Sequence, residues 1–224
     1  MAKRKMIFGT YDTDINGLWT LTEWELEPAQ PVLNMVEVPG RISGPLDMST
    51  VLTDGEPRFG SRTLVATFES SEGNRLERKA RIDTMVNWLS GWRMNIVLPD
   101  DPDRYLVGRI TVEPLYNDLA HASVQVTAIC EPWLYANTET VVSLTAATAE
   151  KTATLSNPGR KTVVPLLEIT GTSASVLIKF GTASWTLGPG TYQLPALVLT
   201  QGDHLLTYSG TGSVKLKYRE AVLA

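Results

Sequence analysis

Only one stretch of this sequence shows the periodicity of an amphipathic helix. Within residues 74–90, apolar side chains recur at helical spacing at Ile82, Met85, Val86 and Leu89. Asn74 followed by Glu77 fits an N-terminal capping box, and Gly91 stands where a left-handed C-terminal cap is expected. Parallel sheets need a helix between successive strands. A chain with a single helix is therefore predicted to be mainly β, with antiparallel strands.

The rest of the first half alternates between apolar and polar residues with a period of two. Such alternation is typical of strands that bury one face. Four sets of residues are each predicted to share a face: Leu64, Ala66 and Phe68; Leu106, Gly108, Ile110 and Val112; Ala122, Val124, Val126, Ala128 and Cys130; and Val32, Val36 and Val38. We expect an antiparallel β-sandwich or a partly closed barrel, with the one helix packed on it.

The second half is rich in Thr, Ala, Gly and Val and shows no helical pattern. Short strands are predicted around Val141, Thr154, Val164, Ile178, Trp185, Leu197, Leu206 and Leu216. Turn signals separate them at Asn157-Pro158-Gly159, Gly171-Thr172-Ser173, Gly181, Gly188-Pro189-Gly190, Gly202-Asp203 and Ser209-Gly210-Thr211-Gly212. This pattern predicts a β-sandwich of the jelly-roll type.

The two halves also differ in charge, which indicates two domains. Before Tyr135 there are 13 basic and 19 acidic residues, and after it 7 basic and 5 acidic. The character changes near Glu131-Pro132-Trp133-Leu134-Tyr135. We predict an N-terminal domain over residues 1–135 and a C-terminal domain over residues 136–224.

The sequence offers little for catalysis, and we expect no enzyme. Glu23, Glu25 and Glu27 would share one strand face, but general acid catalysis needs a desolvated carboxyl group, and a solvated row is the better interpretation. His121 and His204 lie in turn-like segments outside any nucleophile motif. No catalytic residue is therefore assigned.

Metal and cofactor sites are not expected either. Asp100, Asp101 and Asp103 lack the ligand spacing of an EF-hand and are predicted to form a solvated turn. The single cysteine, Cys130, cannot close an intrachain disulfide, which suits synthesis in a reducing compartment. The glycine pairs at Gly188 and Gly210 do not open a helix, so they do not predict a phosphate site.

Other ligands were weighed in the same way. Sugar binding needs exposed aromatic platforms, and Trp185 and Tyr192 are the candidate residues, with Tyr208 and Tyr218 in the same half. The basic residues of the predicted helix alternate with acidic ones, and the acidic first half would repel a duplex, so no specific nucleic-acid binding is expected. Residues 180–202 are uncharged but contain several glycines and prolines, which predicts strands and not a membrane helix. No secretion signal is expected at the N-terminus.

The order of short motifs along the chain is more specific than any reactive residue. The first half contains Asn16-Gly17-Leu18, Thr22-Glu23-Trp24-Glu25-Leu26, Val38-Pro39-Gly40-Arg41, Gly44-Pro45-Leu46-Asp47-Met48-Ser49, Ser61-Arg62-Thr63-Leu64, Trp88-Leu89-Ser90-Gly91, Asp103-Arg104-Tyr105-Leu106-Val107-Gly108-Arg109 and Cys130-Glu131-Pro132-Trp133. The second half adds Asn157-Pro158-Gly159-Arg160, Val164-Pro165, Gly202-Asp203-His204-Leu205-Leu206, Ser209-Gly210-Thr211-Gly212 and Tyr218-Arg219-Glu220. In this order the chain resembles the distal tail proteins of long-tailed, non-contractile bacteriophages.

The resemblance implies a structural role. It implies a hexameric ring of N-terminal domains that joins the tail tube to the tail tip or baseplate, with galectin-like C-terminal sandwiches at the periphery. The implied partners are further copies of the chain, the tail tube protein, a tail-associated hub or fibre protein, the tape measure protein and receptor-binding proteins. The implied location is the virion tail tip, after synthesis in the bacterial cytoplasm. The alternative is a carbohydrate-binding or receptor-recognition module, in which the C-terminal sandwich binds host glycan through Trp185 and a tyrosine such as Tyr192.

Overall fold

The computed structural model of the protein describes residues 5–16, 18–39, 43–51, 53 and 55–223. It divides into two compact units, Met1–Leu134 with Leu223–Ala224, and Tyr135–Val222. The chain passes between the units in β10 (Trp133–Ala136) and β17 (Ala221–Leu223). Gly17, Gly40 and Arg41, which belong to the motifs above, lie outside the described residues.

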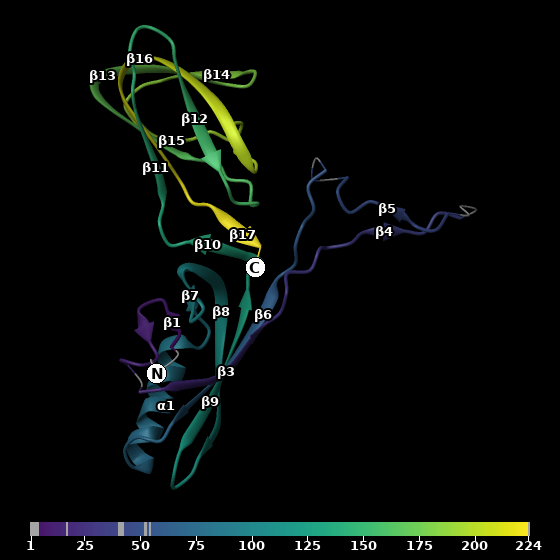
Figure 1. The fold of residues 1–224 in the computed structure, drawn as a ribbon, viewed down its shortest axis with the longest axis vertical. Helices are drawn as coiled ribbons and strands as arrows, with labels where there is room; N and C mark the ends of the chain where they lie inside the picture. The colour runs from purple at the N-terminus through teal and green to yellow at the C-terminus, as the bar shows by residue number, and fades with distance from the viewer. Residues whose placement is uncertain (1–4, 17, 40–42, 52, 54, 224) are drawn as a thin grey trace. The chain divides into compact units, whose positions relative to one another are not determined.

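The N-terminal unit is built on one antiparallel sheet (Figure 1). Its main path runs β2-β1-β7-β8-β9-β6-β3. The strands are β1 (Ile7–Phe8), β2 (Tyr11–Asp12), β3 (Thr20–Leu26), β6 (Arg62–Ser70), β7 (Arg93–Leu98), β8 (Asp101–Asn117) and β9 (Ala122–Cys130). Among the described residues β2 and β3 do not pair with each other, so the sheet is open. The prediction of a mainly β, antiparallel fold is confirmed. The alternative prediction of a partly closed barrel is wrong, because this sheet is open.

The predicted helix is confirmed as α1 (Arg75–Leu89). Asn74 is its N-cap: the side chain accepts from the N–H groups of Leu76 and Glu77, and the Glu77 carboxylate accepts from the Asn74 N–H. Gly91 has the expected positive φ of 85°. Its N–H donates to Ile110 O in β8, so the end of the helix is bonded to the sheet.

The core of this unit lies between α1 and one face of the sheet, chiefly over β8 and β9. Ile82, Met85 and Leu89 of α1 are buried, as the helical spacing predicts. Three of the four predicted strand faces are also buried: those of β6, β8 and β9. Period-two alternation here predicts correctly which face of each strand is buried.

The fourth predicted strand face is wrong as a core face. Val32, Val36 and Val38 are 50%, 42% and 41% exposed. Among the described residues of this region the strands are β4 (Met35–Val36) and β5 (Leu46–Asp47), which pair with each other as a separate two-stranded sheet. The alternation predicts extended backbone correctly at Val36 in β4, but all three valine side chains remain exposed.

The C-terminal unit is a six-stranded antiparallel sheet that folds over on itself. Its strands are β11 (Thr140–Thr145), β12 (Lys151–Asn157), β13 (Leu166–Phe180), β14 (Ala183–Leu187), β15 (Gly190–Gln193) and β16 (Gly202–Tyr218). The two long strands β13 and β16 pair with each other, and each half of them pairs with a different short strand: β11 or β12 on β16, and β15 or β14 on β13. One apolar core contains residues of both halves, among them Ile169, Val176, Leu206 and Leu216. The sandwich prediction is confirmed, while its likeness to galectins stays a prediction.

Two predicted turns are wrong. Gly171-Thr172-Ser173 lies inside β13, and Ser209-Gly210-Thr211-Gly212 lies inside β16. The pairing register shifts between Thr170 and Ser175, and Gly210 and Gly212 have φ of 115° and 116°. The glycines therefore bend continuous strands instead of ending them. The strands predicted around Val164 and Leu197 reduce to one isolated bridge, Val163 with Leu199.

Candidate assembly surfaces

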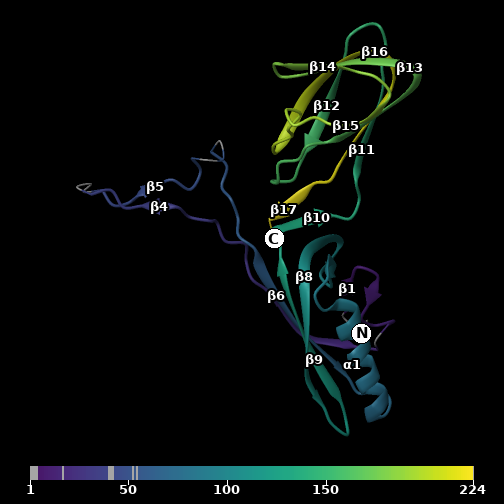
Figure 2. The ribbon, with the colours of Figure 1, turned by 180° about the vertical axis from the view of Figure 1, so that it is seen from behind.

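An exposed apolar segment of the N-terminal unit is formed by the described residues between Pro31 and Phe59 (31–39, 43–51, 53 and 55–59), which we call the arm. It leaves the sheet between β3 and β6, and both views show it running away from that sheet (Figures 1 and 2). At its base, Val32 N–H donates to Arg58 O and Gly60 N–H donates to Gln30 O. Further out, Met35 pairs with Asp47 and Val36 with Leu46.

The arm is apolar on both faces of its first limb. Leu33 and Met35, which are 66% and 50% exposed, alternate with Val32, Val36 and Val38 on the other face. A strand that is apolar on both faces is the kind that sheets bury between two layers. An isolated two-stranded hairpin is only marginally stable in water. The first limb of the arm therefore has the apolar residues of a buried strand, although their side chains are exposed.

A second exposed apolar surface lies near the opposite edge of the same sheet. Trp88 at the end of α1 and Trp92 before β7 are 56% and 64% exposed. Together with Asn87 and Met94 they line a shallow groove of about 460 Å³, which we call the tryptophan groove. Trp88 is backed by buried Tyr11 of β2, with ring centroids 6.4 Å apart. Arg109 donates to the carbonyl oxygen of Gly91, the residue before Trp92.

A third surface lies where the start of α1 meets the β8–β9 turn. Leu76, Leu115 and Leu119 are 79%, 47% and 91% exposed, and a groove of about 550 Å³ opens beside the first two. Buried Arg78 holds this turn, because its guanidinium donates to the carbonyl oxygens of Asp118 and Leu119 at 3.0 and 3.1 Å. The turn is thereby fixed against the helix.

The residues considered for catalysis do not converge. Glu23 and Glu25 in β3 and Glu27 just after it are all exposed, and Glu27 accepts from Thr63 N–H at 3.1 Å. His121 packs its ring against Tyr116 in the N-terminal unit. His204 lies in the C-terminal unit with Nε2 2.9 Å from Thr200 O. The two histidines thus belong to separate units, each engaged with its own turn or strand.

Cys130 and the aspartates near residue 100 are also placed. Burial raises the pKa of the Cys130 thiol to about 11, which keeps it protonated and unreactive at neutral pH. Asp101 and Asp103 lie within β8 and not in a turn, and Asp101 pairs with Arg104 at 3.5 Å. Across the part of the chain that the structure describes, no group of three or more His, Cys, Asp or Glu residues is placed to hold a metal ion. In the same part, no helix has the length and apolar character to span a membrane.

The two candidate sugar-binding residues lie in the C-terminal unit. Trp185 in β14 and Tyr192 in β15 are half-buried and pack against the core of the sandwich. The Tyr192 hydroxyl donates to Gly188 O at 3.2 Å. Tyr208 and Tyr218 are buried. Sugar binding by Trp185 and Tyr192 stays a prediction, while the more exposed tryptophans Trp88 and Trp92 lie in the other unit.

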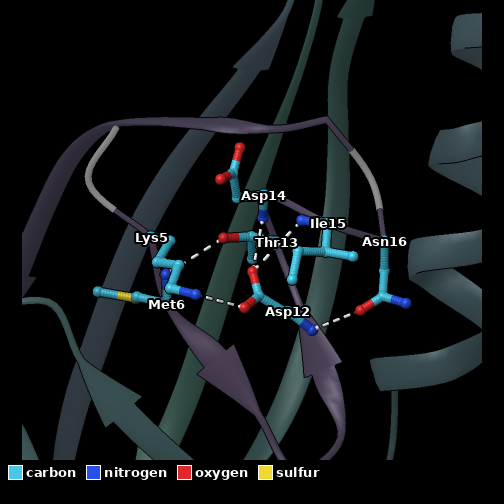
Figure 3. A network of polar contacts seen from close by, with 7 residues as sticks. All are labelled: Lys5, Met6, Asp12, Thr13, Asp14, Ile15 and Asn16. Atoms are coloured by element: carbon cyan, nitrogen blue, oxygen red, sulfur yellow. Dashed lines mark hydrogen bonds and ion pairs between the residues drawn. The ribbon is translucent and has the colours of Figure 1, made fainter. Parts of the chain in front are cut away.

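The turn after β2 has a spacing of oxygen-bearing side chains that resembles a calcium loop (Figure 3). Asp12, Asp14 and Asn16 have the spacing of the first ligands of a calcium loop, and Glu23 has that of the last. The Asp12 carboxylate already accepts from Lys5 Nζ at 2.7 Å and from the N–H groups of Asp14 and Ile15. Glu23 lies in strand β3, where it pairs with Thr67, and not in a helix that returns to the loop. The Asp12 carboxylate in this turn is therefore occupied by the Lys5 ammonium group and by backbone N–H groups of the turn itself.

Comparison with known proteins gives one informative result. No protein-family model matches the sequence, nor does any curated protein. Among solved structures, the chain is similar to the crystal structure of the SPP1 Dit protein, described as a paradigm of the hub adsorption apparatus in Gram-positive infecting phages. The TM-score is 0.67 at 14% sequence identity, and the match covers 96% of this chain and 98% of that chain. The likeness is one of fold, and it extends over both units.

Proposed function

We propose that this chain is a structural subunit of a phage tail, a distal tail protein whose N-terminal units form a hexameric ring between the tail tube and the tail tip. The observation that carries the proposal is the fold likeness to a phage hub protein over nearly the whole of both chains. Fold alone does not determine function. The assembly surfaces described above supply the independent, physical support.

The N-terminal unit has the features of a subunit that joins head to tail. Its arm leaves from the β3–β6 side of the sheet, while the tryptophan groove lies by β7 and α1 on the other side. A contact between two different surfaces of identical subunits is heterologous, and it closes into a ring when the rotation per subunit fits. Exposed apolar patches of this kind mark interaction sites.

The charge of the N-terminal half fits a channel through which DNA passes. With 13 basic and 19 acidic residues before Tyr135, it carries a net charge of −6. We expect part of this surplus to line the bore of the ring, because like charge repels phosphate and prevents DNA from adhering. A strongly positive bore in a reconstructed ring would contradict this part of the proposal.

The C-terminal sandwich is assigned to outward contacts with other tail components. In this role the chain acts by binding and not by catalysis. The partners we propose are further copies of the chain, the tail tube protein and a hub or fibre protein, at the tip of the virion tail.

The ring is tested by mass photometry and light scattering of the full chain over a range of concentrations. Six copies of 24.6 kDa give particles of about 148 kDa, which electron microscopy should show as rings with a central hole. The purified tail tube protein of the same phage is added in a parallel series, because assembly of the ring is linked by mass action to its partners. Particles that stay monomeric in both series would overturn the proposal.

A further inference from the structure

We infer that Trp133 is a positioning residue, which ties the base of the arm to β10, the strand in which the chain leaves the N-terminal unit. Phe59, at the base of the arm, packs its ring against the ring of Trp133 at the start of β10. The biological meaning of this contact rests on the proposed function, in which the C-terminal sandwich makes the outward contacts. In that function the contact links the arm of the ring-forming unit to the passage toward the C-terminal unit.

The arm depends on its base for its direction. Its strands β4 and β5 are two residues long each, and an isolated hairpin is only marginally stable. At the base, the hydrogen bonds from Val32 N–H to Arg58 O and from Gly60 N–H to Gln30 O are both 2.9 Å long. These bonds join the two limbs of the hairpin to each other. The direction of the paired limbs is therefore set by contacts that the base makes with other elements.

The contact between Phe59 and Trp133 is of this kind. Phe59 lies directly opposite Pro31 in an isolated β-bridge, so its backbone belongs to the closure of the hairpin. Its ring centroid lies 5.8 Å from that of Trp133, and the two planes meet at 74°. Both side chains are half-buried. Edge-to-face packing is a preferred arrangement of aromatic rings and adds to the stabilisation that burial alone provides.

Trp133 is a firm support for the arm because the backbone on both sides of it is held. Glu131 N–H donates to Val107 O of β8 at 2.8 Å, and Pro132 restricts the backbone between them. Leu134, the next residue, is buried. β10 itself pairs with β8 and with β17. The Trp133 side chain thus projects from a strand that is already hydrogen-bonded to the sheet.

The other end of β10 is bonded to residues of the C-terminal unit. Ala136 N–H donates to Glu220 O at 3.1 Å, and the Arg219 guanidinium donates to Ala136 O and Asn137 O, both at 2.6 Å. A strand of four residues therefore has the arm base at its start and these bonds at its end. Packed side chains and hydrogen bonds of this kind form a contiguous route for coupling. Such coupling is reciprocal, so it can be measured from either end.

The first test removes the support and measures the arm. Hydrogen exchange of the full-length chain is followed by mass spectrometry, at a concentration below that of assembly. In Trp133→Ala the base, residues 29–34 and 57–62, should exchange about two- to tenfold faster, the factor expected for loss of one aromatic pair. Trp133→Phe should restore most of the protection. Trp185→Ala, the same truncation of a half-buried tryptophan in the other unit, should leave the base unchanged. Equal exchange in Trp133→Ala and the wild type would overturn the inference.

The second test starts from the arm and measures β10. Phe59→Ala should speed exchange of residues 133–137 by a similar factor, whereas Leu33→Ala, an exposed position further along the arm, should not. Unchanged exchange of β10 in Phe59→Ala would overturn the inference. Faster exchange throughout β6 and β9 in either variant would also overturn it, because the loss would then be one of general stability. Ring formation is measured separately by mass photometry, so the expected exchange without hexamers would remove the proposed function and leave this contact in place.

Discussion

The two units of this protein cover the apolar face of an antiparallel sheet in different ways. In the N-terminal unit a single helix, α1, lies on the sheet and buries Ile82, Met85 and Leu89 against it. In the C-terminal unit the long strands β13 and β16 bend at glycines, and the sheet covers itself. A helix covers only the strands beneath it, so the first unit leaves an arm and two tryptophans exposed for other molecules. The self-covered sandwich encloses its core more completely.

The largest effect is expected where the helix cover is broken. Met85 is fully buried in α1, so Met85→Asp places an unpaired carboxylate in the core and should cost more than about 4 kcal/mol of unfolding free energy. We expect the N-terminal unit to unfold while calorimetry still detects a transition of the C-terminal unit. Asn87→Asp, at an exposed position of the same helix, should change stability by less than about 0.5 kcal/mol. Loss of both transitions in Met85→Asp would show that the units do not fold separately.

The next effect concerns the bend of the C-terminal sheet. A Cβ atom on Gly210 would lie 2.0 Å from Ser175 O, so Gly210→Ala must displace backbone. Gly202→Ala is the matched control, because Gly202 has the same φ of 115° but no atom within 4 Å of the added Cβ. We expect Gly210→Ala to be less stable than the control by about 1–3 kcal/mol in urea unfolding. Equal stability would mean that the bend tolerates a side chain and that glycine is used there for φ alone.

A smaller effect is expected at the start of the helix. The Asn74 side chain accepts from the N–H groups of Leu76 and Glu77 at 2.9 and 3.0 Å. Asn74→Ala should therefore lower the free energy of unfolding by about 1 kcal/mol. Asn74→Asp keeps the acceptor and should retain stability. If Asn74→Ala were neutral, packing on the sheet alone would hold the first turn of α1.

The smallest effect depends on pH and involves the turn after β2. Burial by itself would raise the pKa of Asp12, but hydrogen bonds from Lys5 and from the N–H groups of Asp14 and Ile15 outweigh it and hold the pKa below 3.8. The ionised carboxylate thus stabilises the fold above that pH, and the contribution is lost as the pH falls through 3.8 and below. Asp12→Asn should cost less than about 1 kcal/mol at pH 7, and the difference from the wild type should shrink by pH 3. Urea unfolding at the two pH values measures this difference, and a difference that stays constant from pH 7 to pH 3 would contradict the assigned role of the Asp12 carboxylate.

Much of the fold could be predicted from local patterns. The capping residues Asn74 and Glu77 and the spacing of Ile82, Met85 and Leu89 fix the helix, because these signals act within one or two turns. The alternation in β9 predicts both the strand and its buried face. The same alternation at Val32, Val36 and Val38 predicts a strand but the wrong environment. An alternation with a period of two predicts extended backbone, but it does not predict whether another element of the fold packs on that strand.

The glycines of the C-terminal unit and the exposed apolar surfaces show more clearly what could not be predicted from the sequence. Gly171, Gly210 and Gly212 have turn chemistry in sequence, but long-range pairing of β13 with β16 keeps the strands continuous. The exposure of Trp92 could not be predicted, since tryptophan is buried on average and only the end of α1 against β7 leaves it at the surface. A count of exposed rather than total aromatic residues would have directed attention from Trp185 to the N-terminal unit.

The sequence by itself determined that this chain is mainly β, where its helix begins and ends, and which residues of β6, β8 and β9 face inward, because these properties depend on neighbours along the chain. Only the tertiary structure decided the environment of two other strands. The strand that contains Val36 is exposed in the arm, whereas the strand that contains Gly210 is bent within the C-terminal sandwich. Those outcomes depend on contacts between segments far apart in sequence. The free energy of such contacts is set by the area that a distant surface can cover, and no local pattern encodes it.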